Sequence, residues 1–185
     1  MKWRVGFFIF ILFITACSSD KTNADLYIFK YNESSGIATL DPAFAKDQAT
    51  IWATNQLFNG LVQLDNALNV NPSIAKKWSI SNDALSYTFT LRDDVFFHND
   101  ELFENGKGRK VVSKDFEYSF SRLLDKDLAA PGAWVLSNVN SFKAKDDSTF
   151  SIKLKTPFPA FLSLLSMQYC SVVAKEIVDG GNFNR

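Results

Sequence analysis

The chain has 185 residues, of which 46% are hydrophobic and 22% are charged. This composition is ordinary for a folded globular protein and argues against a chain that is disordered throughout. The 20 basic and 20 acidic residues cancel, and no long basic run occurs, so we expect no nucleic-acid partner. The length allows one domain or two small ones.

The N-terminus has the pattern of an export signal. Lys2 and Arg4 precede an apolar run at residues 5–16, which is short of the roughly 20 apolar residues that cross a bilayer. We therefore expect residues 1–16 to be a secretory signal peptide rather than a membrane-spanning helix.

Cys17 follows the small residues that end this run, an order that resembles a bacterial lipobox. The alternative is a chance cysteine beside an ordinary cleavage site. We expect Cys17 to be lipidated and residues 17–25, which are small and polar, to form a tether. Cys170 would then have no partner for a disulfide, and its apolar neighbours predict a small buried hydrophobic residue.

The first half of the remaining chain alternates between strand-like and helical patterns. Residues 26–31 favour a strand, and a loop follows. Asp47 is expected to begin a helix that ends near Phe58, before Gly60 and a short strand at 61–64. The residues predicted on its apolar face are Ala49, Trp52, Ala53 and Leu57.

The central part contains the clearest strand. Residues 71–78 are expected to form a short helical turn, and 82–83 a turn. Strict alternation then predicts a strand with one buried face, formed by Leu85, Tyr87, Phe89 and Leu91. The glycine-punctuated, polar residues 99–110 predict a surface loop.

The last part predicts a helix, a hairpin and a second helix. Ser113 is the expected N-cap of a helix whose apolar face holds Phe116, Phe120, Leu123 and Leu124. Residues 142–155 predict a hairpin around the pair Asp146 and Asp147, with Phe150, Ile152 and Leu154 on one face. A short apolar helix follows near Phe161. These elements together predict an α/β (mixed α+β) fold.

The residues contain no recognisable catalytic set. His98 is the sole histidine and lacks metal ligands at a suitable spacing. The glycines at 106 and 108 lack the spacing of a phosphate loop, and the paired aspartates are best explained as solvated turn residues. We therefore expect no catalytic residues, no metal site and no cofactor, and binding is the default role.

Several motifs occur in a fixed order. They are LDPA at 40–43, LFNGL at 57–61, NPSIAKKW at 71–78, SND at 81–83, YTFTLR at 87–92, VFFHND at 95–100, VVSKDFEYSFSRL at 111–123 and DSTFSIKL at 147–154. Their order resembles the extracytoplasmic solute-binding proteins of family 5, the peptide- and nickel-binding lipoproteins of ABC transporters. The family usually has glycine where Asn99 or Asp100 stands, so the turn there differs.

The resemblance implies a two-lobed periplasmic-binding-protein fold with the ligand between the lobes. Residues 26–185 would be an incomplete N-terminal lobe, with the second lobe missing, as in a fragment or a truncated gene. A loop near the cleft would supply ligand contacts from Asn32, Glu33, Ser34, Ser35 and Gly36, and Trp134 is a further candidate. The alternatives are a plain surface loop for residues 32–37 and a tryptophan that packs in the core or between subdomains.

The resemblance also implies partners and a location. The ligand would be a peptide, with nickel or another small solute left open, and an ABC transporter permease would receive it. The protein would be exported and lipid-anchored to a bacterial membrane, facing the periplasm or the cell exterior. An exported lipoprotein enzyme or a surface adhesion module that shares only the fold remains the alternative.

Overall fold

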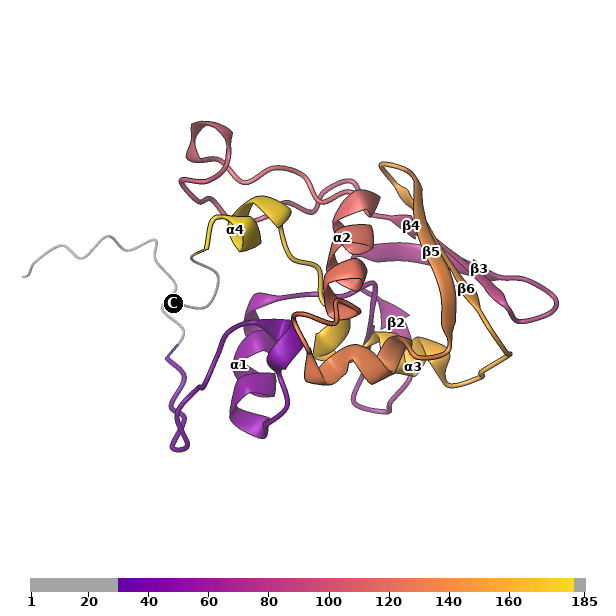
Figure 1. The fold of residues 1–185 in the computed structure, drawn as a ribbon, viewed down its shortest axis with the longest axis horizontal. Helices are drawn as coiled ribbons and strands as arrows, with labels where there is room; N and C mark the ends of the chain where they lie inside the picture. Colours follow the sequence, from indigo (N-terminus) through magenta and orange to yellow (C-terminus); the bar gives the residue numbers. More distant parts are fainter. Residues whose placement is uncertain (1–29, 182–185) are drawn as a thin grey trace, which may run out of the picture. The chain divides into compact units, whose positions relative to one another are not determined.

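A computed structural model describes residues 30–181 of the chain (Figure 1). The predicted signal peptide, Cys17 with its tether, and residues 26–29 of the first predicted strand lie outside the described residues. Residues 33–185 form one compact unit, and residues 1–32 belong to another. Every element described below lies in the larger unit.

A four-stranded antiparallel sheet is the centre of this unit, and a two-stranded sheet accompanies it. In spatial order the larger sheet contains β3 (Ala75–Ile80), β4 (Ser86–Leu91), β6 (Thr149–Leu154) and β5 (Val139–Asp146). The smaller sheet pairs β1 (Val62–Leu64) with β2 (Val70–Pro72). With the helices below, these strands confirm the mixed α/β class.

The predicted faces of β4 and β6 are confirmed. Phe89 and Phe150 are both fully buried and lie opposite each other in the register of the two strands. The same face buries Tyr87, Leu91, Ile152 and Leu154. Alternation with a period of two therefore identified the core side of the sheet correctly.

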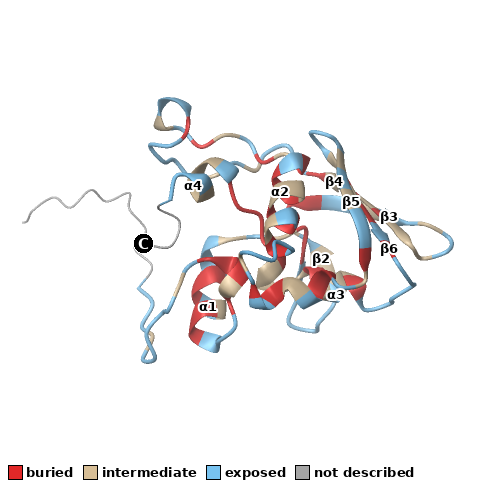
Figure 2. Ribbon diagram, in the orientation of Figure 1, coloured by how far each residue is buried: buried red, intermediate tan, exposed pale blue. Residues whose placement is uncertain are grey.

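Helix α2 (Ser113–Leu123) covers this buried face (Figures 1 and 2). Phe116 and Phe120 are fully buried, and the Phe120 ring meets the Phe150 ring edge-on with centroids 5.5 Å apart. The predicted helix face is right except at Leu124, which is 42% exposed because the helix ends there. The predicted N-cap is wrong by one residue: Val112 occupies the cap, and the Ser113 hydroxyl donates to the Asp146 carbonyl.

Helix α1 (Gln48–Leu57) begins after Asp47 as predicted, but its buried face is rotated from the expected one. Trp52 and Leu57 are 51% and 47% exposed, whereas Thr50 and Thr54 are buried. The Thr54 hydroxyl donates to the Thr50 carbonyl over 2.7 Å, so burial leaves it hydrogen-bonded. The sequence pattern failed here because threonines with satisfied hydroxyls can occupy a core face.

Residues 71–78 do not form the predicted helical turn. Residues 71–72 belong to β2 and residues 75–78 to β3, and β3 pairs with β4 through a register that places Trp78 opposite Phe89. The amide of Arg92 also donates to the carbonyl of Ile74. Pairing with the strongly patterned β4 therefore outweighs the local signal of the Asn-Pro sequence.

Short helices complete the unit. They are η2 (Pro42–Phe44), η3 (Glu104–Gly106), η4 (Pro131–Leu136), α3 (Phe161–Leu165), η5 (Gln168–Cys170) and α4 (Lys175–Asp179). The apolar helix predicted near Phe161 is confirmed as α3, and the hairpin of β5 and β6 is confirmed. Cys170 is buried as predicted, and burial raises the pKa of its thiol to about 12.

Candidate functional site

The loop predicted to contact a ligand is exposed and belongs to no helix or strand. Asn32, Ser34, Ser35 and Gly36 are exposed, and Glu33 is half-buried. The amide of Ser35 donates to the Glu33 carboxylate over 3.1 Å, which bends the chain. Gly36 has a φ of +70°, a conformation that favours glycine.

The chain beyond this loop is fixed by a buried ion pair. Asp41 is fully buried, and one carboxylate oxygen accepts from the amide of Ala43 over 3.0 Å at the start of η2. Arg122 of α2, whose side chain is 13% exposed, donates from Nη1 to Asp41 Oδ1 over 3.0 Å and from Nη2 to Oδ2. This bidentate contact attaches the loop's end to the helix that covers the sheet.

Three short helices meet beside this attachment. Helix η2 packs against both η4 and η5. A side chain at Gly132 in η4 would place its Cβ 2.2 Å from the ring of Tyr169, so glycine permits this close contact. Trp134 on the same turn is 53% exposed. The alternative that Trp134 packs in the core is therefore wrong, and the tryptophan lies on a well-packed turn.

A surface hollow lies directly after the candidate loop. It has a volume of about 440 Å³ and is lined by Ala38, Thr39, Phe44, Lys46 and Asp47. Hydrogen bonds from the amide and hydroxyl of Thr50 lower the pKa of the Asp47 carboxyl. The hollow thus combines apolar surface with an ionised carboxylate and a lysine.

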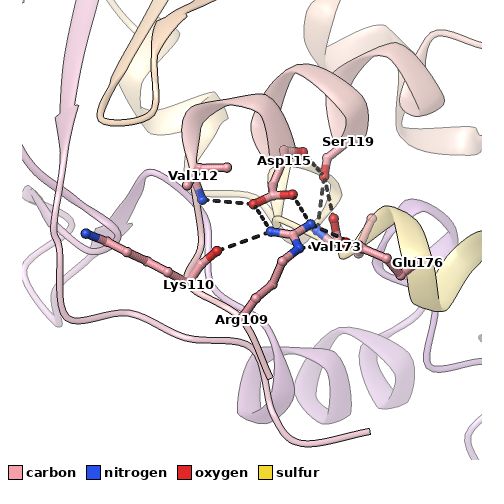
Figure 3. Close-up of polar contacts among 7 residues, drawn as sticks. All are labelled: Arg109, Lys110, Val112, Asp115, Ser119, Val173 and Glu176. Atoms are coloured by element: carbon pink, nitrogen blue, oxygen red, sulfur yellow. Dashed lines mark hydrogen bonds and ion pairs between the residues drawn. The ribbon is translucent and has the colours of Figure 1, made fainter. Parts of the chain in front are cut away.

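A second charged cluster lies at the other end of α2 (Figure 3). Arg109 donates to both oxygens of Asp115, over 2.9 and 2.6 Å, and to both oxygens of Glu176 in α4, over 2.7 and 2.9 Å. Asp115 also accepts from the amide of Val112 over 2.8 Å. These bonds join the loop at 99–110, the start of α2 and α4.

The electrostatics of the Arg109 cluster indicate a structural role. Asp115 and then Glu176 raise the pKa of the Arg109 guanidinium, and Arg109 in turn lowers the pKa of Glu176. All five N–H donors of the Arg109 guanidinium are used by Asp115, Glu176 and the Lys110 carbonyl, so the guanidinium has no donor left for a ligand. The cluster therefore holds segments together rather than offering a binding group.

The structure places the predicted candidates only partly together. The contact between η2 and η4 brings the segment after the loop against the turn that bears Trp134. Sequence reasoning missed Asp41, Arg122 and Arg109 as interacting residues, although the first two lie in the motifs noted above. Asp41 is the one charged residue of the motif at 40–43, and this charge was the available signal.

The described residues contain neither a candidate metal-binding cluster nor a helix that could span a membrane. His98 is exposed, and no group of three His, Cys, Asp or Glu side chains within residues 30–181 is placed to hold a metal ion. In the same part of the chain, no helix has the length and apolar character needed to cross a membrane.

Comparison with known proteins gives the family. Residues 69–185 match the family described as bacterial extracellular solute-binding proteins, family 5 Middle. The dipeptide-binding protein DppE of Bacillus subtilis is 30% identical over 161 residues, or 79% of this chain and 28% of that protein. The periplasmic murein peptide-binding protein MppA of Escherichia coli is 32% identical over 161 residues, or 78% of this chain and 28% of that protein.

A solved structure agrees with these relatives. The ABC transporter-associated periplasmic binding protein DppA from Helicobacter pylori, in complex with the peptide STSA, matches with a TM-score of 0.69 and 31% identity. The match covers 78% of this chain and 30% of that chain. This chain therefore spans about 30% of the length of the relatives it matches. Both comparisons show that the chain belongs to the bacterial extracellular solute-binding proteins of family 5.

Proposed function

We propose that this chain is part of a substrate-binding lipoprotein that captures peptides outside the cytoplasmic membrane for an ABC importer. Relatives named for dipeptide and murein peptide binding support a peptide ligand. The similar protein from Helicobacter pylori is associated with an ABC transporter and was solved with a bound peptide, which supports import through a permease. The role is binding rather than catalysis.

The observation that carries the proposal is the exposed segment that ends at Asp41. Residues 32–40 belong to no strand, and the buried pair of Asp41 and Arg122 fixes their end. A mostly exposed segment of main chain outside any strand suits ligands that are recognised by their own main chain, as peptides are. Trp134 adds an exposed aromatic surface near the same attachment.

The location follows from the N-terminal sequence. Residues 1–16 direct export and are removed, after which lipidated Cys17 and residues 17–25 anchor the protein to a membrane. Each buried CH₂ of an acyl chain contributes about 0.8 kcal/mol, and two or more chains give stable attachment. Mass spectrometry of the membrane fraction should find an acylated Cys17, and Cys17→Ser should abolish it. Unmodified Cys17 in membrane-derived protein would refute the anchor.

Calorimetry with peptides of two to nine residues tests the ligand. The full-length protein of which this chain is part should bind at least one length class stoichiometrically, and Trp134→Ala should weaken binding about tenfold, as loss of an aromatic contact does. Trp52→Ala is the matched control, because Trp52 is 51% exposed and Trp134 is 53% exposed. Absence of binding across all lengths would overturn the peptide proposal. Equal effects of the two substitutions would remove Trp134 from the site.

A further inference from the structure

The face of the larger sheet that points away from the core has an unusual composition. Its central positions carry hydroxyls, and lysines lie toward its edges. The hydroxyl residues are Ser79, Ser86, Thr88, Thr90, Thr149 and Ser151, and the lysines are Lys77, Lys143, Lys145 and Lys153. We call these ten residues the lysine face.

Strand register explains why these side chains share one surface. Thr88 of β4 lies opposite Ser79 of β3 on one side and Ser151 of β6 on the other. Ser151 in turn lies opposite Lys143 of β5. Because the alternate residues of β4 and β6 are buried against α2, this row points to the opposite side, where Figure 1 shows no helix across the described sheet.

A hollow of about 250 Å³ lies within the lysine face. Lys143, Lys145 and Lys153 border it, together with Ser86 and Thr88. The Ser151 hydroxyl in the same hollow donates to the Lys143 carbonyl over 3.2 Å and retains its oxygen as an acceptor. Ammonium groups around hydroxyls suit the phosphate of a lipid headgroup, which accepts hydrogen bonds from both.

The lysines of this face are not neutralised by neighbours. Within residues 30–181, none of the four takes part in an ion pair. Two aspartates lie near the margin. The Ser81 hydroxyl donates to the Asp83 carboxylate and is the main cause of the lowered pKa of Asp83. The positive charge of Lys153 lowers the same pKa to a lesser extent. Asp146 accepts from the amide and hydroxyl of Ser148, over 2.8 and 2.9 Å.

We propose that the lysine face docks on anionic phospholipid headgroups of the membrane that holds the anchor. Four lysines without ion-pair partners on one surface complement the negative charge of anionic lipid, which attracts basic residues near a membrane. This inference rests on the proposed lipid anchor at Cys17, and because the chain from Cys17 to Lys30 reaches at most about 45 Å, an anchored protein stays close to the bilayer. Docking does not depend on which solute the protein binds.

Site-specific acylation of lysines tests the proposal on the full chain attached to vesicles. In vesicles that contain phosphatidylglycerol, Lys143, Lys145 and Lys153 should react several-fold more slowly than in vesicles of phosphatidylcholine alone. Exposed Lys107 and Lys126, which lie outside the lysine face, should react equally in both. High salt should remove the protection, because it screens exposed charges. Equal reactivity of the lysine face in both vesicles would overturn the proposal.

A matched pair of triple variants excludes a general charge effect. Lys143→Gln/Lys145→Gln/Lys153→Gln should abolish the protection of the remaining Lys77, since each lysine contributes about fivefold to the affinity for anionic lipid. Lys107→Gln/Lys114→Gln/Lys126→Gln removes the same charge elsewhere and should leave Lys77 protected. Equal loss in both variants would overturn the proposal. Protection by soluble polyphosphate but not by anionic vesicles would replace the membrane with an acidic polymer.

Peptide calorimetry on the same variants separates this proposal from the proposed function. Both triple variants should bind peptide as the parent protein does, because the altered lysines lie outside residues 32–40 and the η4 turn. If the variant without Lys143, Lys145 and Lys153 lost lipid protection but still bound peptide, docking would be supported independently of the peptide ligand. Intact protection in a protein that binds no peptide would support docking and refute the peptide ligand.

Discussion

The two ends of α2 are held by arginine–carboxylate contacts that differ in burial and in the number of partners. At the C-terminal end, Arg122 is 13% exposed and its partner Asp41 is fully buried. At the N-terminal end, Arg109 is 34% exposed and shares its guanidinium between Asp115, which is 5% exposed, and Glu176, which is 39% exposed. Both contacts therefore attach distant segments to α2, but we expect their loss to lower the free energy of unfolding by different amounts.

The difference shows that geometry alone does not set the importance of an ion pair. Arg92 and Asp94 form an equally good bidentate contact, with distances of 2.9 and 2.8 Å, yet their side chains are 47% and 64% exposed. Exposed pairs contribute little, because water solvates the separated charges well. A buried charge that loses its partner has no such compensation.

Arg122→Ala should cause the largest loss of stability. It leaves the Asp41 carboxylate buried without its guanidinium partner, and the free energy of unfolding should fall by about 3–5 kcal/mol. Urea denaturation measures this change. The double variant Arg122→Ala/Asp41→Asn should be more stable than Arg122→Ala alone, because it removes the unpaired charge and keeps an acceptor for the Ala43 amide. A double variant less stable than the single one would contradict this explanation.

Asp115→Ala should have an intermediate effect. It removes two bonds from Arg109 and the acceptor of the Val112 amide, and the free energy of unfolding should fall by about 2 kcal/mol. Asp115→Asn is the control, because it retains an acceptor for the amide but not the charge. If the two variants were equally unstable, the charge and not the helix cap would account for the loss.

Glu176→Gln should have a smaller effect, below about 1 kcal/mol, because Glu176 is partly exposed and Arg109 retains Asp115. Arg109 lowers the pKa of Glu176 from its ordinary 4.5. The stability that Glu176 contributes is therefore present above about pH 4.5 and is lost as the pH falls through the lowered pKa. Denaturation of both proteins between pH 7 and pH 3 should show the difference shrinking. A difference that grows on acidification would contradict this sign.

Arg92→Ala should have the smallest effect. Its pair with Asp94 is exposed on both sides, so the denaturation midpoint in urea should not change measurably. A loss as large as that of Arg122→Ala would show that bidentate geometry, rather than burial, decides the strength of these contacts.

Parts of the fold with strong local patterns could be predicted from the sequence. Phe89 and Phe150 alternate with hydroxyl residues, and Phe116 and Phe120 repeat at helical spacing, so their buried faces were recognisable. The ion pairs were not, because Arg122 lies 81 positions from Asp41 and no local pattern links them. Contacts at such separations depend on how the elements pack.

Sequence patterns also predict the candidate site only in part. The loop at 32–36 was identified through resemblance to a family, and its exposure alone does not establish a ligand contact. For Trp134 the chemistry of the residue allowed either a core or a surface position, and its exposed fraction of 53% depends on how the η4 turn packs against the rest of the unit. In α1, Thr50 and Thr54 rather than Trp52 face the core, which hydrophobic spacing could not reveal.

The late residues of the chain complete a core that its early residues begin. The ring of Phe161 meets that of Tyr87 with centroids 5.0 Å apart, and the amide of Val172 donates to the Asn59 carbonyl over 3.0 Å. The hydrophobic core therefore cannot close until the segment beyond residue 160 has been synthesised. Contacts between such distant segments form slowly. If residues 1–16 direct export as proposed, this delay would help to keep the chain unfolded until translocation begins.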